Sequence, residues 1–256
     1  MRNKVKEMLA NGQQALGTFY ELGGTAAAEG LAIGGLDFFI IDTEHGPYDV
    51  ESARDAVLAA GNHDITPFVR VKDTTRPSIL KMLDIGAKGL IVPDVRTVQE
   101  VEALVEYAKY DPLGRRGFAP VRASAWGYAP FAQDTDTLFR TANEETLLIP
   151  QCETEECLRH IDEIAAMPGV DGIFIGPYDL SVALGKPAQM DDPELVSAIA
   201  HVLSVCHSHK KIAMIYAGDP ARAKRFFADG FDCVACGMDA IWLIDAVKRM
   251  AAEARA

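Results

Sequence analysis

Short apolar runs recur along this chain at intervals that suit alternating strands and helices. Each run is apolar almost throughout, which is typical of parallel strands covered by helices on both faces. The runs expected to form strands cover residues 15–19, 37–42, 67–71, 88–92, 146–152, 171–175, 211–216 and 231–236. Helical spacing of apolar residues predicts helices between them, for example over 50–60, 98–108, 155–165, 195–208 and 220–229.

Eight strand and helix units predict an α/β fold, a closed (β/α)8 TIM barrel. The chain's length of 256 residues suits a single domain over 1–256. The alternative is an open doubly wound sheet, which normally carries a glycine-rich phosphate turn after its first strand. Gly23-Gly24 and Gly34-Gly35 do not have that spacing. The barrel is therefore the favoured architecture.

Two segments lie outside the regular alternation. The tail over about 238–253 predicts an extra C-terminal helix, whose apolar stripe packs on a neighbouring subunit or on its own barrel. The long irregular segment 110–136 holds Gly114-Arg115-Arg116-Gly117. Long loops within compact domains are often functional, so we expect a hinged, anion-facing cover over the active site. A solvated surface excursion is the alternative.

Composition narrows the possible partners. The chain has 37 acidic and 25 basic residues, a formal charge of −12, which disfavours nucleic acid. A small anionic substrate stays possible, because local arginines and a metal ion outweigh a diffuse field at short range. The charged start and the lack of a long apolar run predict a soluble, cytoplasmic protein without a membrane partner.

Cysteines offer little chemistry. The five cysteines are an odd number without the spacing of a disulfide framework. Cys233 and Cys236 resemble a metal or redox pair, but they lie in one expected strand. Residues three apart in a strand point to opposite faces, which predicts packed thiols.

Two carboxylates stand out, because each lies just past an expected strand. Glu153 follows the strand at 146–152, and Asp179 follows the strand at 171–175. The carboxyl ends of barrel strands are where active sites are assembled. Two oxygen ligands at that end predict Mg²⁺ or Mn²⁺, with open positions for water and a bidentate substrate.

A histidine and an arginine are expected at the same end of the barrel. His45 closely follows the second strand, and a carboxylate on its ring would fix its tautomer for acid–base catalysis. Asp42 is the first candidate for that carboxylate and Asp84 the second. Arg70 lies in the otherwise apolar third strand, so it should meet an anion, either a carboxylate of the fold or a substrate oxygen.

Covalent catalysis is less well supported. Lys88 and Lys211 begin strands and so lie at the wrong end, which leaves Lys72 as the candidate for a Schiff base. Ser124 and Ser181 do not lie in a nucleophile elbow.

The chain resembles the HpcH/HpaI family of metal-dependent class II pyruvate aldolases. This family includes 4-hydroxy-2-oxoheptanedioate, dehydro-deoxyglucarate and keto-deoxyrhamnonate aldolases. The resemblance covers residues 15 to about 245. The matching stretches are Asp42-Thr43-Glu44-His45-Gly46, Phe68-Val69-Arg70-Val71, residues 83–93, Gly114-Arg115-Arg116-Gly117, Gln151-Cys152-Glu153-Thr154 and Gly176-Pro177-Tyr178-Asp179-Leu180-Ser181. One departure is Tyr178, where the family usually has a small residue.

The resemblance implies a barrel of the phosphoenolpyruvate/pyruvate type and a role for each matching residue. Glu153 and Asp179 would bind Mg²⁺ or Mn²⁺, with Co²⁺ possible, while His45 and Asp42 would form the acid–base dyad. Arg70 would hold the ketone or enolate oxygen. The expected substrate site also includes Ser124, Pro177 and the amides around Gly176 and Tyr178. The assembly implied is a hexamer, a dimer of trimers with exchanged terminal helices.

The activity implied is reversible cleavage of a 4-hydroxy-2-oxo acid to an aldehyde and pyruvate, or a related 2-oxo acid, through a metal-stabilised enolate. Such a lyase would serve the catabolism of aromatic compounds or sugar acids. An acyl-CoA lyase like the citrate lyase β-subunit is the alternative enzyme. A catalytically silent binding barrel is the alternative outside enzymes.

Overall fold

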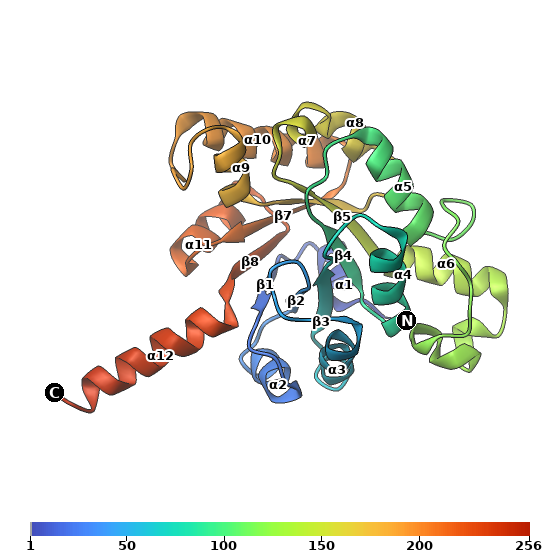
Figure 1. The fold of residues 1–256 in the computed structure, drawn as a ribbon, viewed down its shortest axis with the longest axis horizontal. Coiled ribbons are helices and arrows are strands. Elements are labelled where there is room, and N and C mark those ends of the chain that lie inside the picture. Colours follow the sequence, from blue (N-terminus) through green and yellow to red (C-terminus); the bar gives the residue numbers. More distant parts are fainter. Residues whose placement is uncertain (1) are drawn as a thin grey trace.

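Parallel strands β1 to β8 close into a barrel in sequence order, surrounded by helices (Figure 1). This computed structural model describes residues 2–256. The strands are β1 Ala15–Tyr20, β2 Phe38–Asp42, β3 Thr66–Arg70, β4 Gly89–Val92, β5 Leu147–Cys152, β6 Gly172–Ile175, β7 Ile212–Ala217 and β8 Cys233–Met238. All eight expected strands are present, so the predicted (β/α)8 fold is confirmed.

The helices predicted from apolar spacing are present as well, with one interruption. The segment 155–165 divides at His160, where the backbone leaves the helical conformation between α7 and α8. The helical elements are α1 Lys4–Ala10, α2 Thr25–Ile33, α3 Val50–Ala60, α4 Arg76–Ile85, α5 Val98–Ala108, η1 Arg122–Gly127, η2 Pro130–Ala132, α6 Thr135–Glu145, α7 Glu155–Arg159, α8 Ile161–Ala166, α9 Pro177–Ala183, α10 Pro193–Ser208, α11 Pro220–Asp229 and α12 Asp239–Glu253.

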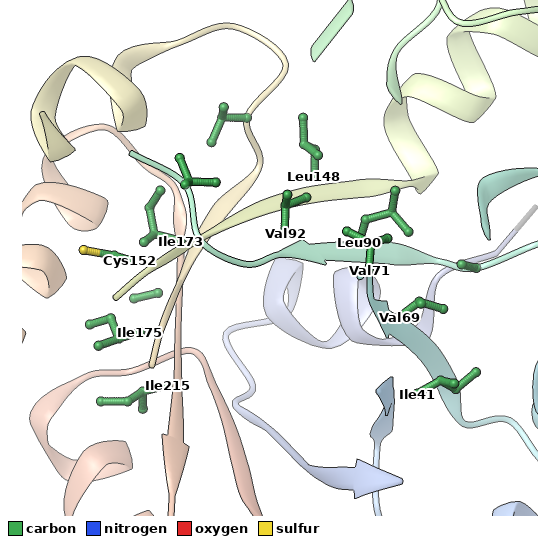
Figure 2. Close-up of a cluster of buried hydrophobic side chains, with 14 of the residues drawn as sticks. Ile41, Val69, Val71, Leu90, Val92, Leu148, Cys152, Ile173, Ile175 and Ile215 are labelled. Carbon is green, nitrogen blue, oxygen red and sulfur yellow. The ribbon is translucent and has the colours of Figure 1, made fainter. Parts of the chain in front are cut away.

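Alternation along the strands divides the core into two layers. Outward residues such as Ile41, Val69 and Ile173 pack against the helices (Figure 2). Inward residues such as Phe38, Phe68 and Phe174 fill the barrel, and Val5 of α1 packs against them at its amino end. Cys233 belongs to the inner layer and Cys236 to the outer one, as predicted for packed thiols.

The segment 110–136 does not cover the carboxyl end of its own barrel, so that prediction is wrong for a single chain. Arg122 of η1 donates from Nη1 to the carbonyl oxygen of Ile85 at 2.6 Å. Arg122 and Trp126 line a cleft together with Thr66 and Lys88, which lie at the starts of β3 and β4. The packing of η1 against the end of α4 therefore carries the segment to the amino end of the barrel.

The C-terminal helix α12 leaves the barrel and extends away from it (Figure 1). Its first turn is anchored, because buried Asp239 accepts hydrogen bonds from the amides of Glu21 and Leu22 at 2.8 and 3.1 Å. The apolar residues beyond Trp242 remain 47–62% exposed; they are Leu243, Ile244, Val247 and Met250. The helix thus does not bury its apolar stripe on its own barrel. None of the helices described in residues 2–256 is long and apolar enough to cross a bilayer.

Candidate active site

The period-two alternation of the strands brings the polar residues to the barrel mouth. Phe38 and Ile40 point inward, so Asp42, at the end of β2, also points inward. On β3, Phe68 points inward, so Arg70, two residues later, does as well. Leu147 and Ile149 of β5 point inward, and the same alternation turns Gln151 and Glu153 toward the barrel mouth. The carboxyl end of the barrel is consequently polar above an apolar interior.

Arg70 and Asp42 form a bidentate ion pair at this mouth. The guanidinium donates from Nε to Oδ1 at 2.9 Å and from Nη2 to Oδ2 at 2.5 Å. Glu44 lies 3.3 Å from the same Nε, and the guanidinium carbon lies 4.8 Å from the ring centroid of Phe19. Burial alone would raise the pKa of Asp42, but Arg70 outweighs burial and holds that pKa below its usual value. Arg70 is therefore fixed in position as a cation.

The expected His45–Asp42 dyad does not form in this structure. Both Asp42 oxygens receive hydrogen bonds from Arg70, and Oδ1 also accepts from the backbone amides of Glu44 and His45 at 3.1 and 3.4 Å. Asp42 thus orders the turn that carries His45 and contacts it through the backbone. The imidazole itself lines the cavity at the barrel mouth, together with Arg70 and Asp179.

Asp84, the second candidate for orienting His45, lies elsewhere. It is on α4, where its Oδ1 accepts from Nη2 of Arg116 at 2.9 Å. Ser124, expected to bind substrate, lies in η1, where its hydroxyl donates to the carbonyl oxygen of Val121 at 2.9 Å. Both positions were expected at the site, and neither residue lines the cavity in this chain. Asp84 lies near the C-terminal end of α4, which precedes β4 and therefore lies at the amino end of the barrel, and segment 110–136 carries Ser124 to the same end.

Glu153 and Asp179 lie just past the ends of β5 and β6, near enough for the charge of Asp179 to raise the pKa of Glu153. Asp179 lies in the first turn of α9 and is exposed, whereas Glu153 is only 8% exposed. Glu153 accepts a 2.6 Å hydrogen bond from the Asp94 amide through Oε1 and one from the Gln151 side chain through Oε2. Burial, together with the charges of Asp179 and Glu44, raises the pKa of Glu153 to about 7, although the hydrogen bonds from Asp94 and Gln151 lower it.

This donor set fits a divalent cation. Glu153 forms no ion pair with the described residues, and a buried carboxylate without a counter-charge is unfavourable. A cation beside Glu153 and Asp179 would supply that charge. No group of three or more His, Cys, Asp or Glu side chains suited to a metal occurs within residues 2–256. Two carboxylates leave positions for water and substrate oxygens, as Mg²⁺ prefers.

Gly176 and Pro177 connect β6 to α9 beside these carboxylates. A Cβ atom on Gly176 would lie 2.9 Å from Nε2 of Gln151 and 3.0 Å from Oε2 of Glu153, so a larger residue would displace these two side chains. The Gly176 amide donates to the carbonyl oxygen of Cys152 at 3.3 Å. Binding of a substrate carboxylate by backbone would therefore fall to the amides after Pro177, those of Tyr178 and Asp179.

Lysine chemistry is not supported by the geometry. Lys72 lines a separate cleft with Asp49, Asp73 and Lys81 and does not line the cavity that contains His45 and Arg70. Lys211 donates to the carbonyl oxygen of Val170 at 2.7 Å, at the start of β7.

Comparison with known proteins places this chain in a family. The model of the HpcH/HpaI aldolase/citrate lyase family matches residues 16–246. The chain belongs to this family. It is 37% identical over 257 residues to a hydroxypyruvate/pyruvate aldolase of Rhizorhabdus wittichii, with 99% of both chains covered. It is 32% identical to a 2-keto-3-deoxy-L-rhamnonate aldolase of Salmonella gallinarum, covering 96% of this chain and 91% of the relative.

A solved structure agrees with this assignment. A HpcH/HpaI aldolase/citrate lyase family protein from Burkholderia cenocepacia superposes with a TM-score of 0.90 at 30% identity, covering 99% of this chain and 100% of the other. The predicted enzyme class, an aldolase, is confirmed, and the acyl-CoA lyase alternative is less supported. Aldolases of this family generally depend on a divalent metal ion.

This aldolase also has site residues that sequence reasoning missed. Phe19, Gln151, Phe174, Tyr216 and Met238 all line the cavity. All of them lie on barrel strands, and inward alternation carried to the end of each strand would have indicated most of them. The same alternation indicates Glu21, which follows β1 at the mouth.

Glu21 is a carboxyl group that adjoins the Asp42–Arg70 pair. Burial, followed by the hydrogen bond and charge of Asp42, raises its pKa to about 7, although the charge of Arg70 lowers it. The folded-state pKa exceeds the ordinary value of 4.5. Protonated Glu21 therefore stabilises the fold fully below pH about 4.5, and this stabilisation is lost as pH rises toward about 7.

Glu21→Gln should flatten this part of the pH profile of stability. With partial solvent screening considered, we expect the variant to gain about 1–2 kcal/mol relative to wild type between pH 5 and pH 8. Urea unfolding at both pH values, with chelator present, measures the difference. Glu51→Gln, at an exposed position of α3, is the control. An equal change in both variants would show that Glu21 carries no special proton.

Proposed function

We propose that this aldolase reversibly cleaves 4-hydroxy-2-oxo acids to an aldehyde and pyruvate, or a related 2-oxo acid. Glu153 and Asp179 would hold Mg²⁺ or Mn²⁺, with Co²⁺ as a further possibility. The observation that carries the proposal is the buried carboxylate of Glu153, which forms no ion pair within residues 2–256 and lies within reach of the charge of Asp179, at the mouth that also holds Arg70 and His45. The names of the two aldolase relatives support a 2-oxo acid product.

Each residue has a role that follows from its contacts. A divalent ion would supply a Lewis acid that polarises the ketone of the 2-oxo acid. Arg70 is held by Asp42 through Nε and Nη2, so its Nη1 is available to donate to the oxygen on which charge develops. The His45 imidazole lines the same cavity and is suited to accept the 4-hydroxyl proton. The C3–C4 bond then breaks, and C3 of the enolate takes up a proton to give pyruvate.

Proton exchange at the methyl group of pyruvate in D₂O tests this proposal without an aldehyde. NMR should show exchange catalysed by the protein with Mg²⁺, Mn²⁺ or Co²⁺, and none above background after removal of metal by a chelator. Aldol cleavage should respond to the chelator in the same way. Activity that survives the chelator, together with inactivation by borohydride plus pyruvate, would instead indicate a Schiff base on Lys72.

The same proposal includes a homo-oligomer built through α12, specifically the hexamer of two trimers with exchanged terminal helices. Its support is the apolar stripe of α12, which stands away from the barrel with Leu243 and Ile244 each 51% exposed and Val247 47% exposed. A monomer would leave this stripe exposed to water. Burying it against another subunit would gain about 25 cal/mol per Å² of apolar surface.

Asp substitution on the stripe should break the assembly. Leu243→Asp combined with Val247→Asp is expected to shift the mass measured by native mass spectrometry from a hexamer to smaller species. Lys248→Glu, on the same helix, is the matched control and should keep the wild-type mass. A wild-type protein that is monomeric at micromolar concentration would contradict the proposal directly.

A further inference from the structure

The cavity at the barrel mouth has two chemically different sides. It encloses about 190 Å³. His45, Arg70 and Asp179 form its polar side, near Glu153. Its apolar side is formed by Phe19, Phe174, Tyr216 and Met238, which lie on β1, β6, β7 and β8. Tyr178 of α9 completes the apolar side.

The aromatic rings of the apolar side form a continuous row of edge contacts. The ring centroids of Phe174 and Phe19 are 6.2 Å apart, those of Phe19 and Tyr216 are 5.8 Å apart, and those of Tyr216 and Tyr178 are 5.8 Å apart. Exposure increases along the row, from 1% for Phe174 to 46% for Tyr178. The row therefore runs from the barrel interior to solvent and offers an apolar surface to an entering molecule.

The charges around the cavity disfavour a second anion. Arg70 is the one arginine or lysine among the lining residues of the described chain, and Asp42 and Glu44 already contact its guanidinium. Asp239, which accepts a hydrogen bond from the Glu21 amide, adds another carboxylate near the mouth. A carboxylate on the aldehyde would meet this acidic surrounding and find no uncommitted cation among the cavity-lining residues within 2–256.

From this arrangement we infer that the aldehyde used by the enzyme is uncharged and apolar, an aliphatic or aromatic aldehyde that binds against the aromatic row, with Tyr178 determining its selectivity. The inference rests on the proposed function. In the synthetic direction, C3 of the pyruvate enolate bonds to the aldehyde carbon, and the aldehyde oxygen takes a proton to become the 4-hydroxyl. No oxidant or further reactant is needed. An acidic semialdehyde would be a poor acceptor.

The selectivity test compares kcat/KM for different aldehydes with saturating pyruvate and Mg²⁺ in the full-length enzyme. Hexanal should exceed acetaldehyde by at least about 10-fold, since added methylenes gain from an apolar pocket. The uncharged methyl ester of succinic semialdehyde should exceed succinic semialdehyde itself by about 10-fold or more. A preference for succinic semialdehyde over its ester would overturn the inference.

Variants of Tyr178 locate the selectivity, with each ratio measured within one variant. Tyr178→Ala should reduce the ratio of hexanal to acetaldehyde by about 10-fold, while Tyr178→Phe should keep it. Tyr178→Lys should raise the ratio of succinic semialdehyde to its ester. Val182→Ala, at a 61% exposed position of the same helix outside the cavity, is the matched control and should behave as wild type. An unchanged hexanal ratio in Tyr178→Ala would overturn the role of Tyr178.

The pyruvate exchange experiment distinguishes a failure of the aldehyde inference from a failure of the proposed function. Metal-dependent exchange in wild type, combined with a preference for anionic aldehydes, would overturn the aldehyde inference and leave the proposed function standing. Absence of exchange with any of the three metals would overturn both. Exchange together with the expected aldehyde order supports both.

Discussion

Glu153→Gln should lower metal-dependent exchange of pyruvate protons and aldol turnover by at least about 10³-fold, because Lewis-acid stabilisation worth several kcal/mol depends on the ion that Glu153 would hold. The substitution keeps the shape of the side chain and removes its charge. Gln151 has a buried Oε1 atom without a partner among the described residues, so its amide can turn to accept from the new side chain. The fold should therefore persist.

Metal binding provides a readout of this variant that does not depend on activity. An ion that binds the folded state at 100 times its Kd stabilises it by about 2.7 kcal/mol. Mn²⁺ should therefore raise the Tm of the wild type and leave that of Glu153→Gln nearly unchanged. Glu155→Gln, two residues further along at an exposed position, should respond as wild type. An equal Mn²⁺ response in both variants would remove Glu153 from the metal site.

Arg70 variants should lose both activity and stability, because this side chain is expected to serve the substrate and the fold at once. Loss of one donor to a developing oxyanion costs about 10²–10³-fold in kcat. Arg70→Met should also lose about 3–5 kcal/mol of unfolding free energy, because a buried ion pair that loses one partner leaves an uncompensated charge. That charge is the carboxylate of Asp42, whose side chain is 1% exposed.

A double substitution distinguishes these two effects. Asp42→Asn combined with Arg70→Met removes both charges, and urea unfolding should show that it recovers most of the lost stability. Exchange and turnover should stay at the level of the single Arg70 variant. Arg70→Lys keeps the charge but cannot form the bidentate pair, so it should fold and still lose activity. Recovery of activity in the double variant would contradict the role of Arg70 toward the substrate.

The strand pattern predicted the architecture and the end of the barrel at which chemistry is assembled. Glu153, Asp179 and His45 each follow a buried apolar strand, and that position alone places them at the carboxyl end. Inward alternation then predicts that Arg70 faces the barrel mouth. These properties are local, since they depend on a strand's own period and on where the strand ends.

The choice of partners was not predictable in the same way. Asp42 was expected to orient His45, yet the register of β2 and β3 places Asp42 directly opposite Arg70, with both side chains inward. Two side chains side by side at the end of neighbouring strands can form a direct ion pair. The sequence of a single strand does not determine which residue of the next strand lies opposite.

The long segment 110–136 shows the same limit on a larger scale. Its length and its glycines indicated a cover, but its course depends on packing against α4, including the hydrogen bond from Arg122 to Ile85. That packing also keeps Ser124 away from the chain's own cavity.

By itself, the sequence determined an eight-stranded α/β barrel with two acids, a histidine and an arginine at its carboxyl end, because apolar periodicity and strand ends are encoded locally. Only the tertiary structure decided that Asp42 binds Arg70, that Glu21 joins them, and that an aromatic row forms one side of the cavity. Those contacts join residues from different strands and from α9, and barrel closure with its strand register brings them together.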